Sequence, residues 1–419
     1  MNLLKTSALN GVAVLIKTAT LFILNKILAI YVGPSGYAMI GQFQNFIQMI
    51  TTFSGSMINT AVTKYTAEYY EDKQKQKKIW QNAGSIVFIL SVLFALLIII
   101  FQQELSLYIF HSLEYQSVFI WFAIFLVFFN FNTLFLAILN GKKEILKLVL
   151  ANIAGSLVSL VITTALAVKY HLYGALIALS VYQSLAFFVT LYLCYKADWF
   201  KVSYLFGRID SDIAHKFMSF ALMALVSAIC VPLSQIVIRT YLSQTFGADY
   251  AGYWEAMIRL SAAYLMLVTT TLGVYYLPRL SELTSLVDIK KEVYLGYKFI
   301  FPLAILGGGL AYLLRDWLIV VLFSKKFLPM ADLFLWQMIG DALKIGSWIL
   351  AYLMLSKAMT KLFVTTEIVF AISSIILTYI CTKKFGFEGV SIAHLINYGL
   401  YWLIISFFIF KNLQARVIK

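Results

Sequence analysis

Charged side chains are scarce in this sequence: they make up 12% of its 419 residues, whereas hydrophobic residues make up 62%. Soluble globular proteins carry about 25% charged and about 45 to 50% apolar residues. The mean hydropathy of +0.86 therefore excludes a series of soluble domains and indicates that lipid surrounds most of the chain. The net charge of +14 is spread in short runs between apolar segments, so we expect no nucleic acid partner.

Cysteine and histidine are too few and too scattered for the chemistry that they usually support. Cys194, Cys230 and Cys381 fit neither a disulfide framework nor a zinc site. The four histidines lack the spacing of metal ligands, and no phosphate-loop pattern G-x-x-x-x-G-K-[ST] occurs. We therefore expect no enzyme, no metal and no cofactor. Without nucleotide chemistry, the energy sources left to a protein surrounded by lipid are the membrane potential and a proton gradient.

Long apolar runs are what the sequence does have. Each is about twenty residues long, which is enough for a helix to cross a bilayer and too long for a strand of a membrane barrel. The first run carries Lys17 and exceeds the length of a signal peptide, so we expect it to be retained. We predict an all-α integral membrane protein with about twelve spans, at about residues 8–31, 36–63, 81–101, 117–139, 146–168, 173–195, 216–239, 250–277, 293–314, 331–355, 362–381 and 389–410.

The basic residues between these spans predict the orientation. If the N-terminus is inside, the inner segments hold 19 of the 33 Lys and Arg residues and the outer loops hold 6. Because positive charge accumulates on the cytoplasmic side, both termini should be cytoplasmic.

The two halves of the chain resemble each other when Lys169 of the first half is aligned with Lys384 of the second. In this alignment, which we call the repeat alignment, Tyr170, Gly174 and Lys196 fall on Phe385, Gly389 and Lys411. We infer an N-terminal lobe (1–196), a cytoplasmic linker (197–215) and a C-terminal lobe (216–419). Since six is even, the six-helix lobes should be related by a pseudo-two-fold axis along the membrane normal, around a central cavity.

Basic residues inside the spans are candidates for binding an anion, because a charge in the bilayer costs several kcal/mol unless it is paired or reaches water. Lys17 lies near the middle of the first span, with no acidic residue within one turn. Lys26 is on the opposite side of the same helix, where snorkelling to the interface competes with binding. Arg259 and Lys344 are the basic candidates of the second half.

Acidic residues inside the spans are candidates for charge pairing or coupling. Glu255 with Arg259, and Asp341 with Lys344, have spacings that allow an ion pair within one helix. Each pair is either a structural salt bridge or part of a water-filled substrate site. Glu367 has Lys361 as its nearest base, so it either takes part in proton coupling or reaches cytoplasmic water.

One face of the second span is polar along its whole length. Amides and hydroxyls recur every three or four residues, which predicts either helix packing or a cavity wall that contacts a glycan. The residues assigned to that wall are Asn45, Gln48, Thr52 and Asn59.

Four stretches resemble a known family, the bacterial flippases for O-antigen units and enterobacterial common antigen. They are Val32-Gly33-Pro34-Ser35-Gly36-Tyr37, Thr63-Lys64-Tyr65, Tyr276-Leu277-Pro278-Arg279-Leu280-Ser281, and Leu314-Arg315-Asp316 through Phe323-Ser324-Lys325-Lys326-Phe327 to Trp336-Gln337 and Gly340-Asp341.

This family lies in the multidrug/oligosaccharidyl-lipid/polysaccharide exporter superfamily. The resemblance implies a bacterial inner membrane protein that moves an undecaprenyl-pyrophosphate-linked oligosaccharide from the cytoplasmic to the periplasmic leaflet by alternating access. It also implies basic residues facing a central cavity from helices 1 and 8, which here are Lys17 and Arg259. Membrane lipids, and polysaccharide polymerase and chain-length proteins of the same pathway, are the implied partners.

Two other functions compete with this interpretation. A cation-coupled multidrug exporter of the same superfamily would need carboxylates deep in the N-terminal lobe, but Glu68, Glu104 and Glu144 are at predicted helix ends. A membrane-embedded polysaccharide polymerase or glycosyltransferase would need a large outer loop with catalytic residues, and no predicted outer loop exceeds about fifteen residues.

Overall fold

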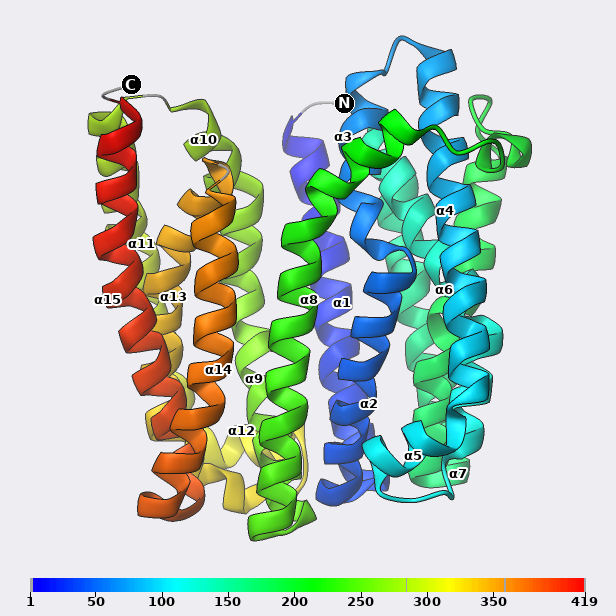
Figure 1. Cartoon of the computed structure of the whole chain (residues 1–419). Coiled ribbons are helices and arrows are strands. Elements are labelled where there is room, and N and C mark those ends of the chain that lie inside the picture. The colour runs from blue at the N-terminus through cyan, green and yellow to red at the C-terminus, as the bar shows by residue number, and fades with distance from the viewer. Residues whose placement is uncertain (1–2, 284, 358, 418–419) are drawn as a thin grey trace. The chain divides into compact units, whose positions relative to one another are not determined.

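The computed structural model describes residues 3–283, 285–357 and 359–417, and helices make up nearly all of these ranges (Figure 1). Within them, eight helical stretches are long and apolar enough to cross a membrane. Two of the eight, Ile145–Tyr195 and Thr360–Ile409, are 51 and 50 residues long, enough for two passes each. The more polar helices α2 (Gly33–Ser54) and α9 (Ala248–Thr271) complete the twelve predicted passes.

The contacts within the chain divide it into two compact units, residues 1–232 and 233–419. The boundary lies inside α8 (Ser211–Phe246). The segment 197–215, which we predicted to be a linker, packs on α4 (Lys73–Ile100): Ser85 Oγ donates to the Gly207 carbonyl at 2.9 Å, and the Asp210 amide donates to Asn82 Oδ1 at 2.6 Å. The lobe bounds 1–196 and 216–419 stay a prediction.

The α-helices of the two units follow one another in the same order. Besides α2 and α4, the first unit contains α1 (Leu3–Tyr31), η1 (Ser56–Ile58), α3 (Asn59–Glu68), α5 (Gln102–Phe110), α6 (Gln116–Gly141), α7 (Ile145–Tyr195) and η2 (Val202–Leu205). Besides α9 and most of the apolar part of α8, the second contains η3 (Leu272–Tyr276), α10 (Leu277–Glu282), α11 (Leu286–Leu313), α12 (Arg315–Leu322), η4 (Lys325–Leu333), α13 (Phe334–Ser356), α14 (Thr360–Phe385), η5 (Gly386–Glu388) and α15 (Gly389–Val417). In this order, α7 of the first unit corresponds to α14 and α15 of the second.

The element bounds correspond in the repeat alignment that the sequence predicted. The last residues of α1 and α6 fall on the last residues of α8 and α13, and the first residues of α2 and α7 fall on the first residues of α9 and α14. The matched bounds are Tyr31 and Phe246, Gly141 and Ser356, Gly33 and Ala248, and Ile145 and Thr360. A single duplication explains all four matches.

Two glycines that are matched in the repeat alignment pack in the same way. A Cβ atom on Gly174 would collide with the Leu166 carbonyl, and one on Gly389 would collide with the carbonyl of Cys381. Each contact reaches back about two turns along the chain, which therefore reverses sharply between two long helices. In α7 the turn includes His171, whose φ of 50° and ψ of −128° interrupt the helix. The break that we predicted between residues 168 and 173 is therefore present, although it is shorter than expected.

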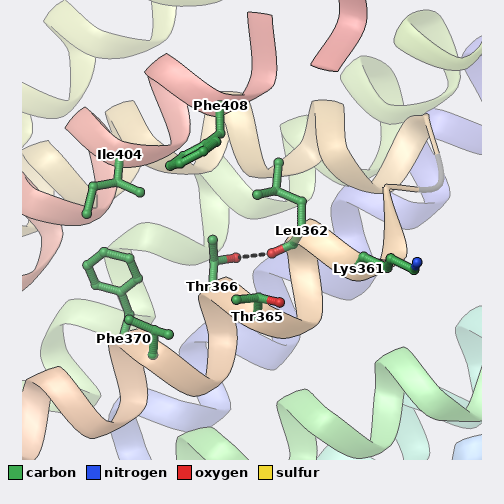
Figure 2. A pocket seen from close by; sticks show the side chains of 8 residues that line it. Lys361, Leu362, Thr365, Thr366, Phe370, Ile404 and Phe408 are labelled. Atoms are coloured by element: carbon green, nitrogen blue, oxygen red, sulfur yellow. Dashed lines mark hydrogen bonds between the residues drawn. The ribbon is translucent and has the colours of Figure 1, made fainter. Parts of the chain in front are cut away.

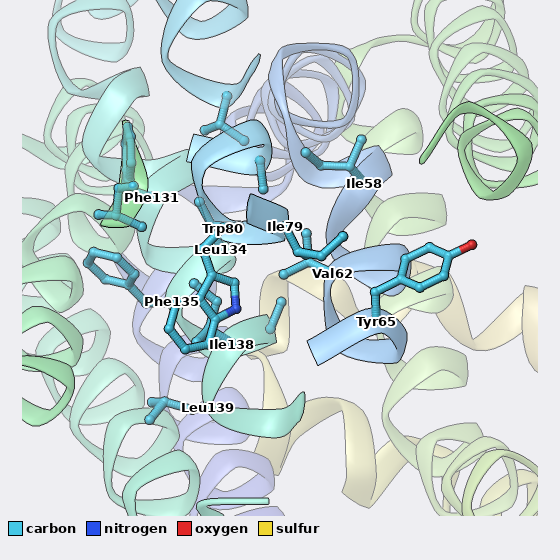
Figure 3. Packing of buried hydrophobic residues seen from close by; sticks show 14 of the residues in the cluster. Ile58, Val62, Tyr65, Ile79, Trp80, Phe131, Leu134, Phe135, Ile138 and Leu139 are labelled. Carbon is cyan, nitrogen blue, oxygen red and sulfur yellow. The ribbon is translucent and has the colours of Figure 1, made fainter. Parts of the chain in front are cut away.

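The core of the first unit lies where α3, α4 and α6 meet (Figure 3). Trp80 and Phe135 are almost fully buried there, together with Val62 and Leu134. The indole of Trp80 donates to Thr66 Oγ1 at 3.0 Å, which satisfies the polar atom of an otherwise apolar cluster.

The second span is not the continuous helix 36–63 that we predicted. It ends as an α-helix at Ser54 and resumes as α3 after the 3₁₀ turn η1. The Ser54 carbonyl accepts from Ser91 Oγ at 3.3 Å, while the Ile58 amide donates to Gly55 instead. Because a hydroxyl from α4 replaces the helical donor, the polar face of this span is divided at Gly55.

Candidate functional site

The first polar site of the second unit is a triad on α8 and α9, which we call the Glu255 triad: Arg239, Glu255 and Arg259. Arg259 Nε donates to Glu255 Oε1 at 2.7 Å, and Arg239 Nη2 donates to Glu255 Oε2. The side chains of Arg239 and Glu255 are 1% and 6% exposed. Glu255 and Arg259 thus form the ion pair that their spacing allows, whereas Arg239 enters from the neighbouring helix.

The Glu255 triad contains one more positive than negative charge. Two guanidinium groups share one carboxylate, and the Arg239 guanidinium also lies over the Trp254 ring, 5.5 Å from its centroid. The Arg259 side chain is 14% exposed, more than the side chains of Arg239 and Glu255. A surplus cation in apolar surroundings is stabilised by an anion, and the guanidinium fork suits phosphate oxygens.

The second polar site joins α9, α13 and α15, and we call it the Asp341 cluster. Asp341 is 1% exposed. It accepts a hydrogen bond from His394 Nε2 at 2.9 Å, one from the Tyr264 hydroxyl at 2.5 Å, and one from Gln337 Nε2 at 3.3 Å. Two serines extend the network through Gln337, and the full cluster is Ser261, Tyr264, Gln337, Asp341, Ser391 and His394.

Lys344 does not pair with Asp341, which corrects our prediction for this helix. Within the described residues, the basic side chain in contact with Asp341 is His394, and the two form an ion pair only when the imidazole is protonated. Lys344 lies over the rings of Trp348 and Tyr398, 5.0 Å from each centroid. The aromatic rings hold the ammonium one turn away from the carboxylate, so the two charges interact without a salt bridge.

Lys17 and Lys26, the basic candidates of the first unit, lie on different sides of α1. Lys17 is exposed, and among the described residues no acceptor lies within hydrogen-bond or ion-pair distance of its ammonium group. Lys26 is half-buried. Next to it, Asn25 Oδ1 accepts from the Tyr37 hydroxyl at 2.8 Å and joins α1 to α2. A straight α1 cannot direct both lysines to one ligand, as predicted from their spacing.

The predicted glycan-facing residues differ in exposure. Gln48 is exposed and Thr52 is half-buried, with the Thr52 hydroxyl donating to the Gln48 carbonyl at 2.8 Å. Asn45 is buried, and its Nδ2 has no hydrogen-bond partner among the described residues. Asn59 lies beyond the break, in α3, and its buried Oδ1 likewise lacks a donor in that part of the chain. Their contact with a glycan stays a prediction.

Glu367 lies on α14, half-buried and close enough to Tyr401 of α15 for the two to interact electrostatically. Beside it the same two helices form a groove of about 380 Å³ (Figure 2). Lys361 stands at one end of the groove and Phe370, Ile404 and Phe408 line it. The Thr366 hydroxyl donates to the Leu362 carbonyl at 2.9 Å, so this wall offers an almost wholly apolar surface.

The segments around α12 that carry the family resemblance meet at one end of the second unit. Phe323 and Phe327 are buried with their ring centroids 5.5 Å apart, which fixes the turn between α12 and η4. Arg315, Asp316 and Trp336 line a polar hollow of about 240 Å³ at this turn. The motif residues therefore shape the end of this unit, and only Gln337 and Asp341 reach into the buried cluster.

Sequence reasoning missed three participants in these sites. Arg239 was placed at the edge of a predicted span, His394 was counted among scattered histidines, and Tyr264 was not assigned to a binding or coupling site. Only His394 had a signal in the sequence, which is the glycine at position 340, just before Asp341. A Cβ atom at Gly340 would lie 2.5 Å from His394 Cδ2, so the glycine leaves room for the imidazole.

A family model described as "Polysaccharide biosynthesis protein" matches residues 3–284, about two thirds of the chain. The chain belongs to this family. The family that the motif residues predicted is thereby confirmed. Two curated relatives, each named "Lipid III flippase" and found in Escherichia coli (strain K12) and Shigella flexneri, are 29% identical over 405 residues. The alignment covers 96% of this chain and 97% of each relative.

The fold of this chain is also found in solved structures of transporters. An inward-facing MATE family transporter of the MOP superfamily superposes with a TM-score of 0.75 at 13% identity, over 94% of each chain. The lipid II flippase MurJ, in an inward closed conformation, gives 0.71 at 14% identity, over 96% of this chain and 87% of that one. At these identities the likeness establishes the fold alone, and it confirms the all-α membrane architecture.

Proposed function

We propose that this protein is a flippase that moves a polyprenyl-pyrophosphate-linked oligosaccharide from the cytoplasmic to the periplasmic leaflet of a bacterial inner membrane. The family and the relatives named as lipid III flippases support the class of substrate. An O-antigen unit and an enterobacterial common antigen unit, both carried on undecaprenyl pyrophosphate, are the substrates that the resemblance implies.

The partly exposed guanidinium group of Arg259 is the observation that carries this proposal. Arg259 is held in place by Glu255 and keeps 14% of its side chain exposed, so it is positioned to bind the pyrophosphate. Lys17, which is exposed on α1 of the first unit, is a further candidate, while Lys26 and Lys344 are the weaker candidates. Asn45, Gln48, Thr52 and Asn59 offer amides and hydroxyls to the glycan.

The membrane potential supports outward movement of this substrate. An inside-negative potential favours moving each negative charge outward by about 2.3 kcal/mol per 100 mV. The polyprenyl chain stays in lipid, so only the head group must cross. With both termini in the cytoplasm, as the positive-inside rule predicts, the loaded and empty sites would move in opposite directions in this field.

The partners follow from this role. Membrane lipids surround the protein, and the flipped unit passes to enzymes of the same pathway, such as a polysaccharide polymerase with its chain-length protein. No catalytic step is assigned to this chain.

A cation-coupled multidrug exporter is the competing function, and the first unit argues against it. A binding site for cations in that unit would need a buried carboxylate. Glu68 is the last residue of α3, Glu104 is in the short helix α5, and Glu144 precedes α7 and accepts from the Trp199 indole at 2.9 Å. All three lie at helix ends, where a solvated or interfacial role suffices.

Deletion of the gene tests the proposed function. Mass spectrometry should find a lipid-linked oligosaccharide that accumulates after deletion and disappears when the wild-type gene is restored. Arg259→Gln should fail to restore it, whereas Arg208→Gln, an exposed arginine outside the Glu255 triad, should succeed. The absence of any such intermediate in the deletion strain would contradict the flippase assignment.

A further inference from the structure

The Asp341 cluster is built around one carboxylate that is almost completely buried within a membrane helix. Three donors surround it: His394 and Gln337 on Oδ1, and Tyr264 on Oδ2. A carboxylate that receives three hydrogen bonds is stabilised in its ionised form. Because an ionised carboxylate has no proton to give, the hydrogen between the two residues belongs to His394 Nε2.

This assignment leaves His394 Nδ1 as the atom that can take up a proton. Among the described residues Nδ1 makes no hydrogen bond, and the His394 side chain keeps 20% of its exposure. Imidazole is the side chain whose charge changes most readily near neutral pH. Protonation at Nδ1 converts the pair from imidazole and carboxylate to imidazolium and carboxylate, with no other bond made or broken.

The charges around the pair make this change consequential. The titratable groups that interact with Asp341 or His394 are Tyr264 from α9, Lys344 from α13 and, through Lys344, Tyr398 from α15. With His394 neutral, Asp341 and Lys344 balance each other. With His394 charged, the Asp341 cluster together with Lys344 has a net charge of +1, and the contact between α13 and α15 becomes a full ion pair.

The backbone around the pair is shaped for this contact. Gly340 allows α15 to approach α13 so closely that any side chain there would displace the imidazole. The His394 ring also packs against Tyr398, with centroids 4.8 Å apart, so it is held on the side of Asp341. A change in the charge of this imidazole therefore acts at a close contact between the two helices.

We propose that His394 and Asp341 form a proton-binding site in which His394 Nδ1 takes up one proton and Asp341 serves as its fixed counter-ion. In transport, which rests on the proposed flippase function, uptake and release of this proton change the strength of the link between α13 and α15. The proton gradient then adds to the membrane potential as a driving force.

Histidine-selective NMR tests the proton site without any transport. The chain has four histidines, so substituting the other three leaves His394 as the single signal in ¹⁵N-histidine-labelled protein. Asn is suitable at 111, where φ of 55° and ψ of 27° are left-handed helical, Gly is suitable at 171, where φ of 50° and ψ of −128° suit glycine, and Gln is suitable at 215. We expect the His394 signal to change from its neutral to its charged form as the pH is lowered from about 9 to about 5.

Two variants show whether Asp341 is the counter-ion. Asp341→Asn should move the transition of His394 to lower pH by about one unit or more, because the charged imidazole loses its partner. Tyr264→Phe keeps the shape of the site and removes one donor from the carboxylate, so it should move the transition to higher pH. A His394 signal that stays neutral throughout, or a transition that neither variant moves, would overturn the proposal.

Transport in proteoliposomes tests the coupling separately. At zero membrane potential, a pH gradient should accelerate flipping by the wild-type protein, and the rate of His394→Gln should be the same with and without the gradient. His215→Gln, which changes an exposed histidine, should respond as the wild type does. A wild type that flips at one rate regardless of the gradient would refute the coupling, whereas a wild type that does not flip refutes the proposed function and leaves the NMR result standing.

Discussion

The two units have the same order of helices but bury different chemistry. The second buries Glu255, Asp341 and part of His394. In the repeat alignment the first has Ile40, Leu126 and Leu179 in their places, all buried. Apolar pattern and glycine turns are enough to repeat the scaffold, so the charges of the second unit are additions that the fold does not require.

The first unit uses neutral hydrogen bonds where the second uses ion pairs. Asn130 Nδ2 donates to Ser54 Oγ at 2.7 Å and to Ser91 Oγ at 2.8 Å, which joins α2, α4 and α6. Asn132 Nδ2 donates to Gln183 Oε1 at 3.0 Å between α6 and α7. Neutral pairs satisfy polar atoms in lipid at a lower desolvation cost than charges, which indicates that the ion pairs were retained for function.

Glu255→Gln should give the largest loss of stability. It removes the carboxylate that two guanidinium groups share in the protein interior, which costs about 3 to 5 kcal/mol. Ile40→Val at the matching position of the first unit should cost about 1 kcal/mol. Thermal unfolding in detergent, followed by circular dichroism, measures both, and equal effects would show that the Glu255 triad does not hold the second unit together.

Gly174→Ala and Gly389→Ala should have equal effects if the turns are truly duplicated. Each added methyl group meets backbone atoms that cannot move aside, so we expect a loss of about 3 kcal/mol from each. Gly309→Ala is the control: a Cβ there meets nothing within 4 Å, and the change should stabilise α11 by up to about 1 kcal/mol. If one of the two turns tolerates alanine and the other does not, the turns at Gly174 and Gly389 are not structurally equivalent.

Replacing the charged residues around Asp341 by their counterparts in the first unit separates stability from function. Asp341→Leu, Lys344→Phe and His394→Leu together reproduce Leu126, Phe129 and Leu179, so the carboxylate and the ammonium group that balance each other are removed together. Well-packed apolar residues replace buried charges at a cost of about 2 kcal/mol or less. The melting temperature should therefore change little, while the dependence of flipping on pH is lost. If flipping keeps its pH dependence in this variant, the charges of the second unit have another purpose.

The smallest effect concerns the first residues of α4 and α11. The Asp72 carboxylate accepts the Lys75 amide at 3.0 Å, and this bond lowers the pKa of Asp72 below its usual 3.8. Its contribution is present above the unfolded pKa and is lost as the pH falls through the folded pKa. Ser285 caps α11 through a neutral hydroxyl at 3.2 Å. Hydrogen exchange near pH 3 should therefore show faster opening at the start of α4 than at pH 5, and no such change at α11.

Much of the scaffold was predictable because the pattern of apolar residues is local. The order of residues along the chain is enough to predict twelve passes, helices instead of strands, and the repeat alignment. The interruption at Gly55 was not predictable, since it depends on a hydroxyl that reaches Ser54 from α4. The short helices α5 and α12 were missed for a related reason: each is only two or three turns long and has no apolar period of its own.

The candidate site was predictable only where both partners lie on one helix. Glu255 and Arg259 are one turn apart, and their pair could be read from the spacing. Arg239 reaches Glu255 from another helix, and His394 reaches Asp341 across 53 residues of sequence. Spacing alone favoured Lys344 as the partner of Asp341. In the structure the Lys344 ammonium group lies over two aromatic rings, and the His394 imidazole contacts the Asp341 carboxylate instead.

The central claim is that the partly exposed Arg259 guanidinium group of the second unit binds an anionic head group during flipping. The most direct measurement is the rate at which purified protein in liposomes flips a polyprenyl-pyrophosphate-linked oligosaccharide. We predict that Arg259→Gln slows flipping about tenfold or more, because a charge-assisted hydrogen bond is worth about 1.5 to 3 kcal/mol. Lys17→Ala should also slow it, without changing stability. Wild-type rates in both variants would contradict the account.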